Sequence, residues 1–129
     1  ELLSTSDVVS LHCPLTEQTH HLIGREQLRL MKPSAVLINS SRGPLVDEAA
    51  LVDALRDHRL GGAGLDVFEF EPQLSDGLAA LSNVVLTPHI GSAGVQTRDA
   101  MALLAVDNAL AVLAGDRPVT PVAAMGFVQ

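Results

Sequence analysis

The sequence has one cysteine and one lysine, and both shortages narrow the classes of protein that it can belong to. Cys13 has no partner for an internal disulfide, which excludes a disulfide framework and fits a reducing compartment, so we expect a cytoplasmic protein. Lysine and arginine total 8 against 15 aspartates and glutamates, giving a formal net charge of −7. Because the arginines form no basic run, the charge pattern argues against nucleic acid and anionic membranes as partners.

Long apolar runs and leader segments are also missing. The most apolar stretch, residues 100–114, contains Asp107 and Asn108, and it falls short of the roughly 18 to 20 uninterrupted residues that a membrane span needs. We predict that it forms a well-buried helix of a soluble domain. No positively charged start precedes an apolar segment, so we predict no signal peptide. Because Glu1 is not an initiator methionine, we expect the sequence to begin within a longer protein.

The residues that are present predict a folded domain with a parallel sheet. Apolar residues make up 47% of the chain and charged residues 18%, a balance that is typical of folded proteins. Several short apolar runs do not alternate with polar residues, which is typical of parallel strands covered on both faces. The predicted strands lie at 8–11, 35–38, 63–67 and 84–86.

Helical patterns occupy the segments around these strands. The segment 47–58 begins with a capping aspartate and ends in basic residues before two glycines, so cap, dipole and stop signals agree. The predicted helices lie at 25–31, 47–58 and 96–113, with a helix tail at 1–3. The order of strands and helices predicts an α/β fold with right-handed crossovers. No G-x-G-x-x-G follows a strand, so a phosphate-binding loop, if there is one, would precede Glu1.

Charged and polar residues follow each predicted strand. Parallel strands end at the same edge of a sheet, where ligands bind in open α/β folds. The segments that follow the strands are 12–14, 39–43, 69–72 and 87–92. They supply an arginine, glutamates and histidines, which together can clamp an oxyanion or carboxylate and carry a proton. The sequence therefore predicts a proton-transfer site at this edge.

Three blocks, at 39–48, 64–72 and 83–92, resemble the signature blocks of the D-isomer-specific 2-hydroxyacid dehydrogenases. The resemblance covers about residues 1–122 and is greatest for the glyoxylate/hydroxypyruvate reductase branch. It implies the later half of a Rossmann-type doubly wound parallel sheet, with the first half and the substrate domain before Glu1. Residues 1–117 would then be a partial NAD(P)-binding domain, and 118–129 a linker or tail toward the substrate domain.

The resemblance also implies roles for individual residues. Arg42 would hold the carboxylate and keto oxygen of the substrate, and His89 would donate a proton to the carbonyl oxygen as hydride reaches the carbon. Glu71 would form a hydrogen bond with the ring nitrogen of His89 that faces away from the substrate. Asp66 would accept a hydrogen bond from the carboxamide of the nicotinamide. The cofactor is expected to be NAD or NADP. In the family, the residue that selects between the two ends the second strand, which is not part of this sequence. The expected cofactor-binding residues are His12, Pro14, Thr19, Ser40, Ser41, Arg42, Asp66, His89, Gly91 and Ser92.

The implied reaction is the reduction of a small 2-keto acid, glyoxylate or hydroxypyruvate, to a D-2-hydroxy acid. The resemblance implies a homodimer for the full-length protein and an inactive isolated fragment. Two alternatives stay open: a dinucleotide-sensing, corepressor-like binding protein of the same fold, and a fragment that serves assembly only. We expect the strand at 8–11 to leave an unpaired edge where the first half of the sheet belongs.

Several other residues have simpler expected roles. His20 and His21 follow Thr19 in a polar segment and are expected to be solvent-exposed loop residues. Cys13 is expected to be a small buried side chain rather than a nucleophile. His12, Cys13, His20 and His21 do not have the spacing of ligands in known families of metal sites, so we expect no metal site here.

Overall fold

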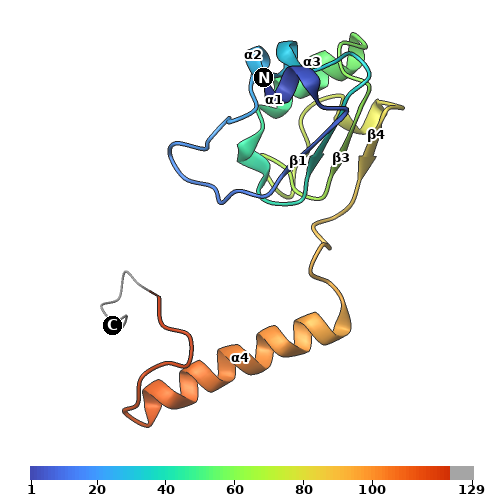
Figure 1. Cartoon of the computed structure of the whole chain (residues 1–129). Coiled ribbons are helices and arrows are strands. Elements are labelled where there is room, and N and C mark those ends of the chain that lie inside the picture. The colour runs from blue at the N-terminus through green and yellow to red at the C-terminus, as the bar shows by residue number, and fades with distance from the viewer. Residues whose placement is uncertain (123–129) are drawn as a thin grey trace. The chain divides into compact units, whose positions relative to one another are not determined.

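The structure is a computed structural model that describes residues 1–122. The chain folds as two compact units, Glu1–Ile90 and Gly91–Gln129. Figure 1 shows the elements of both units along the chain. The predicted division at residues 117 and 118 stays a prediction, and residues 123–129 lie outside the described part.

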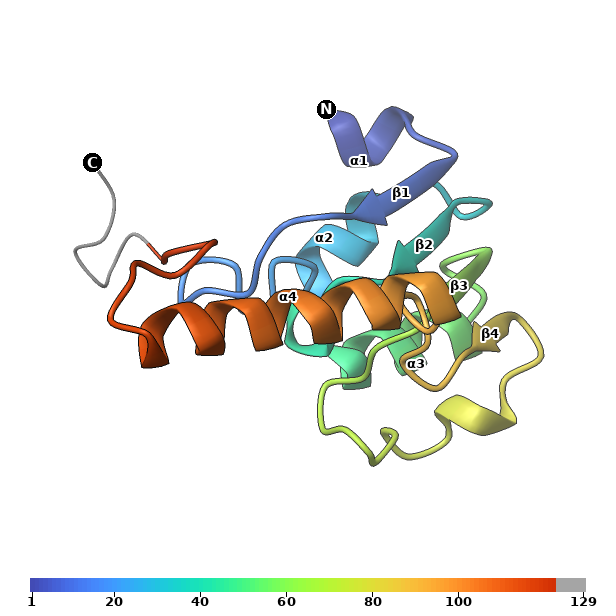
Figure 2. The ribbon, with the colours of Figure 1, turned by 90° about the horizontal axis from the view of Figure 1, so that it is seen from below.

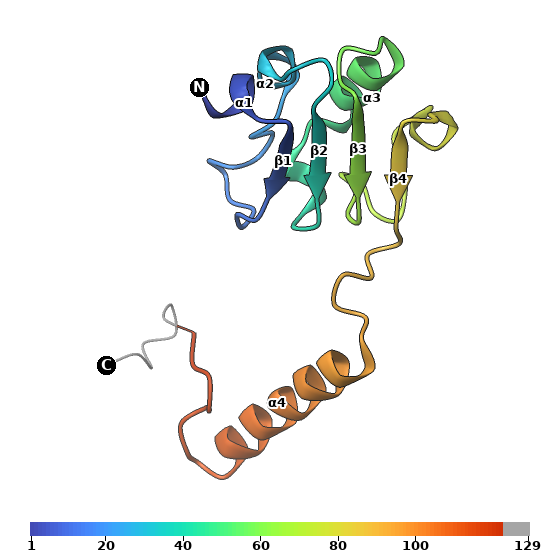
Figure 3. The same cartoon turned by 45° about the vertical axis from the view of Figure 1, so that its right-hand side comes forward.

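The first unit contains one sheet of four parallel strands. The strands are β1 (Val8–Leu11), β2 (Val36–Asn39), β3 (Gly62–Leu65) and β4 (Val84–Leu86). They are ordered β1-β2-β3-β4, and each neighbouring pair is parallel. Figure 3 shows all four arrows pointing the same way, so the carboxyl ends of the strands lie at one edge of the sheet. The predicted parallel α/β fold is therefore confirmed.

Helices precede or connect the strands at nearly the predicted positions. They are α1 (Leu2–Thr5), α2 (Arg25–Leu30) and α3 (Glu48–Arg56), with 3-10 turns at Gly43–Leu45 and Leu78–Ala80. The start of α3 is fixed by Asp47, whose side chain accepts a hydrogen bond from the amide of Ala50. Its inward side chains Leu51 and Leu55 have no exposed surface, so α3 is held mainly by the core.

The helices between strands cover one face of the sheet. Figures 2 and 3 show α2 and α3 on the same side, as expected for two successive crossovers of the same hand. In β1, Val9 and Leu11 are buried, whereas Val8 is 61% exposed. The prediction that both faces are covered is therefore wrong for β1, whereas in β3 Gly62, Ala63 and Leu65 are all buried. β1 pairs only with β2 in this sheet, so its other edge is open, as predicted.

The second unit is built on α4 (Val95–Leu113), a helix of 19 residues. The segment that follows is tied to the helix by Asn108, whose side chain donates to Thr120 Oγ1 (2.9 Å) and accepts from its amide (3.0 Å). None of the residues of α4 is buried, because its own unit supplies no second layer to cover it. The helix predicted at 96–113 is confirmed, but the prediction that it is well buried is wrong for the described residues. Within 1–122, no helix combines the length and apolar character needed to cross a membrane.

Candidate active site

The loop after β2 carries Arg42 and is fixed by the last residue of the strand. Asn39 is 1% exposed, its amide group donates to the carbonyl of Arg42 (2.9 Å), and its side-chain oxygen accepts from the amide of Ser41 (3.1 Å). The Ser41 hydroxyl donates to the carbonyl of Leu11 at the end of β1 (2.8 Å). The side chain of Asn39 thus provides hydrogen-bond partners for the backbone groups of the turn, and it determines where Arg42 leaves the sheet.

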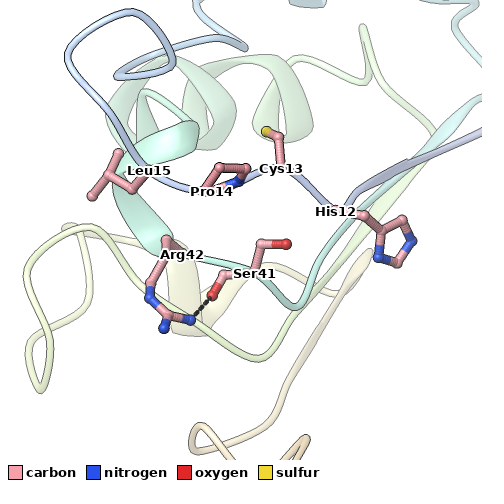
Figure 4. A pocket seen from close by; sticks show the side chains of 6 residues that line it. All are labelled: His12, Cys13, Pro14, Leu15, Ser41 and Arg42. Carbon is pink, nitrogen blue, oxygen red and sulfur yellow. Dashed lines mark hydrogen bonds between the residues drawn. The ribbon is translucent and has the colours of Figure 1, made fainter. Parts of the chain in front are cut away.

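The side chain of Arg42 lies exposed at the carboxyl edge. Its Nη1 donates to the carbonyl of Ser41 (2.7 Å), which orients the guanidinium (Figure 4). Arg42 lines both a groove of about 660 Å³ and a cleft of about 450 Å³. A guanidinium keeps further N–H donors in a planar fork after such a bond, so it can still bind two oxygens of a carboxylate.

His89 follows β4 and forms a pair with Glu71. Nδ1 of His89 lies 2.9 Å from Oε2 of Glu71, and the other oxygen of Glu71 accepts from the amide of Phe68 (3.0 Å). The hydrogen bond from His89 and then the bond from the Phe68 amide hold the pKa of Glu71 below its usual value, with the charges of His89 and Arg42 contributing less. Glu71 is therefore ionised at neutral pH and accepts from Nδ1, which leaves Nε2 of His89 for a ligand.

The backbone at His89 is held in an uncommon conformation by Asp66. His89 has φ of 53°, in the left-handed region that non-glycine residues rarely adopt. Asp66 follows β3 directly, is 9% exposed, and accepts from the Thr87 hydroxyl and from the Ile90 amide (2.9 Å). These two hydrogen bonds restrain the chain before and after His89, so a buried carboxylate stabilises a strained turn.

The structure brings the three predicted catalytic side chains to one cleft. Arg42, Glu71 and His89 come from the ends of different strands and the loops after them, and all three line the cleft of about 450 Å³. The cleft therefore combines a cation that can hold a carboxylate with an imidazole whose far nitrogen is oriented by a carboxylate. Such a set can bind a small anionic substrate and transfer a proton. The other residues that line it are Gly43, Pro44, Phe68, Glu69 and Phe70.

The predicted cofactor-binding residues are only partly gathered. His12, Pro14, Ser41 and Arg42 line the groove of about 660 Å³, together with Cys13 and Leu15 (Figure 4). Cys13 is half-buried and packs against the core, which is less burial than expected.

Other predicted cofactor-binding residues lie outside the lining of this groove. The Thr19 hydroxyl donates to the carbonyl of Pro14 (2.8 Å) and accepts from the amide of Thr16 (2.7 Å), so it shapes the loop after β1. Ser40 is exposed and is not part of the lining. Gly91 and Ser92 belong to the second unit. The cofactor roles of all these residues stay predictions.

Sequence reasoning missed a second group of linked side chains beside the cleft. His21 was expected to be exposed, but it is half-buried, with Nε2 2.7 Å from Oε1 of Glu69. Glu48, the first residue of α3, is 3% exposed, and the sequence analysis assigned it no role. His21 and Glu69 are 48 positions apart, and no local pattern signals their pairing. His20, His21 and Glu69 place possible ligand atoms within 4.8 Å of one another, but both oxygens of Glu69 already accept hydrogen bonds.

The sequence is similar to that of known proteins over most of its length. Residues 1–91 match the sequence model of the D-isomer specific 2-hydroxyacid dehydrogenase family, NAD binding domain. A glyoxylate/hydroxypyruvate reductase B of Enterobacter agglomerans is 61% identical over 115 residues, which are 88% of this chain and 36% of that protein. A glyoxylate reductase of Thermococcus litoralis is 53% identical over 117 residues, covering 91% of this chain and 35% of that protein.

A solved structure agrees in fold over almost the whole chain. It is the NADPH-dependent glyoxylate/hydroxypyruvate reductase of Sinorhizobium meliloti in complex with NADP and malonate, with a TM-score of 0.93 and 42% identity. The match covers 99% of this chain and 40% of that one. The present chain thus spans little more than a third of the length of these relatives.

Proposed function

This chain belongs to the D-isomer specific 2-hydroxyacid dehydrogenase family, and on that premise we propose that it is part of a nicotinamide-dependent reductase of small 2-keto acids. Glyoxylate or hydroxypyruvate would be reduced to the D-2-hydroxy acid. One observation carries the proposal: Arg42, Glu71 and His89 line one cleft at the carboxyl edge of a parallel sheet. The names of the relatives support the substrate class.

The side chains divide the work of the reaction between them. Arg42 holds the substrate carboxylate through its planar fork, which places the keto carbon over the cleft. Nε2 of His89 donates a proton to the keto oxygen, while Nδ1 stays bonded to ionised Glu71, which fixes the orientation of the ring. A nicotinamide held in the adjoining groove by His12, Pro14 and Ser41 would supply the hydride, and so the two electrons, to the keto carbon. The 2-keto acid is reduced, and in the reverse direction His89 takes the proton back.

The residues present fit the nicotinamide half of NAD or NADP. The groove of about 660 Å³ adjoins the cleft at the carboxyl ends of β1 and β2, and it falls within the roughly 300 to 1,000 Å³ that is usual for ligand sites. Ser41 and His12 offer polar contacts, and Pro14 offers an apolar wall. Asp66 is proposed to contact the carboxamide in addition to holding the turn at His89. The chain has no G-x-G-x-x-G for the phosphates.

Two proposals about the setting of the full-length protein accompany this function. We propose that it acts in the cytoplasm, with the single cysteine Cys13 as support. We also propose that it is a homodimer, for which the family resemblance is the support. The net charge of −7 favours a small-molecule substrate over nucleic acid.

The test follows oxidation of NADH or NADPH by the full-length protein with glyoxylate, hydroxypyruvate and pyruvate. We expect His89→Ala to lower kcat by about 10² to 10⁴, because positioned proton transfer is lost. Arg42→Ala should mainly raise KM for the keto acid, because the carboxylate loses its partner. Matched controls are His58→Asn and Arg29→Ala, which change exposed residues of the same types outside the cleft. Equal rates in wild type, His89→Ala and Arg42→Ala would refute the assignment and leave the dinucleotide-sensing alternative.

A further inference from the structure

A buried carboxylate outside the three catalytic side chains holds the segment that carries Glu71. Glu48, the first residue of α3, is 3% exposed. Its Oε2 accepts from the amide of Glu69 (2.9 Å), and its Oε1 accepts from the amide of Ser75 (2.7 Å). One carboxylate therefore bonds both ends of the segment 69–75, in which Glu71 lies.

Glu69 returns the contact and extends it to a third part of the chain. Its Oε2 accepts from the amide of Glu48 (3.0 Å), and its Oε1 bonds Nε2 of His21 (2.7 Å). The amide of His21 donates to the carbonyl of Pro44 (2.8 Å), two residues after Arg42. Hydrogen bonds of the Glu48, Glu69 and His21 side chains thereby join three parts of the chain. These parts are the start of α3, the loop after β1 and the segment 69–75.

Packing alone does not fix the segment 69–75. Phe70 is 62% exposed and Leu74 is 37% exposed, so neither of these apolar side chains belongs to the buried core. A segment with few buried apolar contacts opens easily unless other bonds restrain it. The bonds from Glu48 and Glu69 supply that restraint, and a buried carboxylate is tolerated because both of its oxygens accept amide hydrogens.

We propose that Glu48, acting through Glu69 and His21, is a positioning residue that keeps Glu71 within hydrogen-bond reach of Nδ1 of His89. This inference rests on the proposed function in one respect, because the proposed function assigns proton transfer to the Glu71–His89 pair that Glu48 positions. Arg42 depends on other contacts, namely the bond from Asn39 and the close approach of Gly43 to Phe68. Loss of Glu48 should therefore impair proton transfer more than substrate binding.

The test substitutes Glu48→Gln in the full-length protein. Glutamine has nearly the same shape, but its NH₂ group faces one of the two amide donors, so one end of the segment is released. We expect kcat to fall about 10- to 100-fold, since small misplacements of catalytic groups have effects of this size, with KM for the keto acid changed less than twofold. The matched control is Asp47→Asn at the neighbouring position, which caps α3 without touching the segment and should leave kcat within twofold.

A second readout does not depend on turnover. Amide hydrogen exchange of Glu69 and Ser75 should become at least about tenfold faster in Glu48→Gln, with the amides of β2 unchanged. The pKa of Glu71, followed by carbon NMR of its carboxyl, should rise toward its usual value in Glu48→Gln but not in Asp47→Asn.

The two readouts separate this inference from the proposed function. A wild-type protein without turnover contradicts the proposed function alone, and the exchange rates and the Glu71 titration then decide the positioning role. Unchanged exchange and an unchanged Glu71 titration in Glu48→Gln overturn it. If Glu48→Gln fails to fold, Glu48→Asp keeps the charge but shortens the side chain, so that it cannot reach both amides. An unchanged kcat with unchanged exchange at Glu69 and Ser75 in that variant overturns the positioning role as well.

Discussion

The two oxygens of Glu71 have different partners, and this division explains its ionisation. Oε2 bonds His89 and Oε1 accepts from the Phe68 amide, and both bonds favour the charged form. The pKa of Glu71 is therefore lower in the folded protein than the ordinary 4.5. A carboxylate with a depressed pKa stabilises the fold at every pH above its ordinary value, and this contribution is lost as the pH falls through the depressed value.

Replacement of Glu71 should make this pH dependence visible. At pH 7 we expect Glu71→Gln to unfold more easily than wild type, because glutamine loses the charge-assisted bonds to His89 and Phe68. As the pH falls below about 4.5, the wild-type carboxyl takes up a proton and the difference should shrink. Urea unfolding of both proteins at several pH values between 7 and 3 measures it. A difference in the free energy of unfolding that stays constant over this range would contradict the assignment.

The individual residues show how far sequence reasoning reaches at this scale. Arg42, Glu71 and His89 were found because each follows a predicted strand within a recognisable block, and parallel strands must end at one edge. The pairing of His21 with Glu69 and the burial of Glu48 were not found. Those contacts join residues far apart in sequence and exist only once α3 and the loops have folded onto each other.

At the scale of elements, the predicted strands and helices agree with the structure where local signals are strong. α3 begins after its capping aspartate and ends in a basic turn, as predicted. β3 ends at Leu65, two residues earlier than predicted, and the side chain of Asp66, which follows it, accepts from Thr87 and Ile90. Burial was predicted less well, since the cover over a strand face or over α4 depends on which other elements are adjacent and not on the element itself.

The 3-10 turn that begins at Gly43 shows how closely two elements approach at the site. A Cβ atom at this position would lie 1.8 Å from the carbonyl oxygen of Phe68 and 2.5 Å from the amide of Glu69, and these backbone atoms cannot move independently. We expect Gly43→Ala to destabilise the protein by about 1 to 3 kcal/mol or more, and to lower activity by moving Arg42 away from Glu71. Thermal and urea unfolding measure the first effect, and keto acid reduction measures the second.

The control for this variant is Gly24→Ala in the same unit. A Cβ there meets the side-chain oxygen of Gln27 at 3.4 Å and the carbonyl of His21 at 3.6 Å, which are ordinary contacts. Gly24 precedes α2 as its N-cap, so alanine should cost less than about 1 kcal/mol. Equal losses in Gly43→Ala and Gly24→Ala would show that the close approach to Phe68 does not restrict the turn.

At the scale of the whole molecule, the first unit gathers the three proposed catalytic side chains on a sheet in which β1 is an edge strand. β1 has a strand neighbour on one side only, and alternate residues of this strand are exposed. An open strand edge presents unpaired N–H and C=O groups that can pair with another chain. This chain covers only 36% and 40% of two of its relatives, so those proteins have further segments available to cover this edge.

The chain alone should therefore associate through β1. We expect sedimentation of the 129-residue chain to show association that increases with concentration, and Val8→Lys to raise the monomer fraction, because a lysine on an edge strand opposes strand pairing. The matched control is Leu30→Lys on α2, which replaces a side chain that is 59% exposed, close to the 61% of Val8, away from the strand edge. If the two lysine variants raise the monomer fraction equally, association follows general surface hydrophobicity. If neither changes it, the exposed helix α4 becomes the surface to test, and the open edge of β1 is then not the cause.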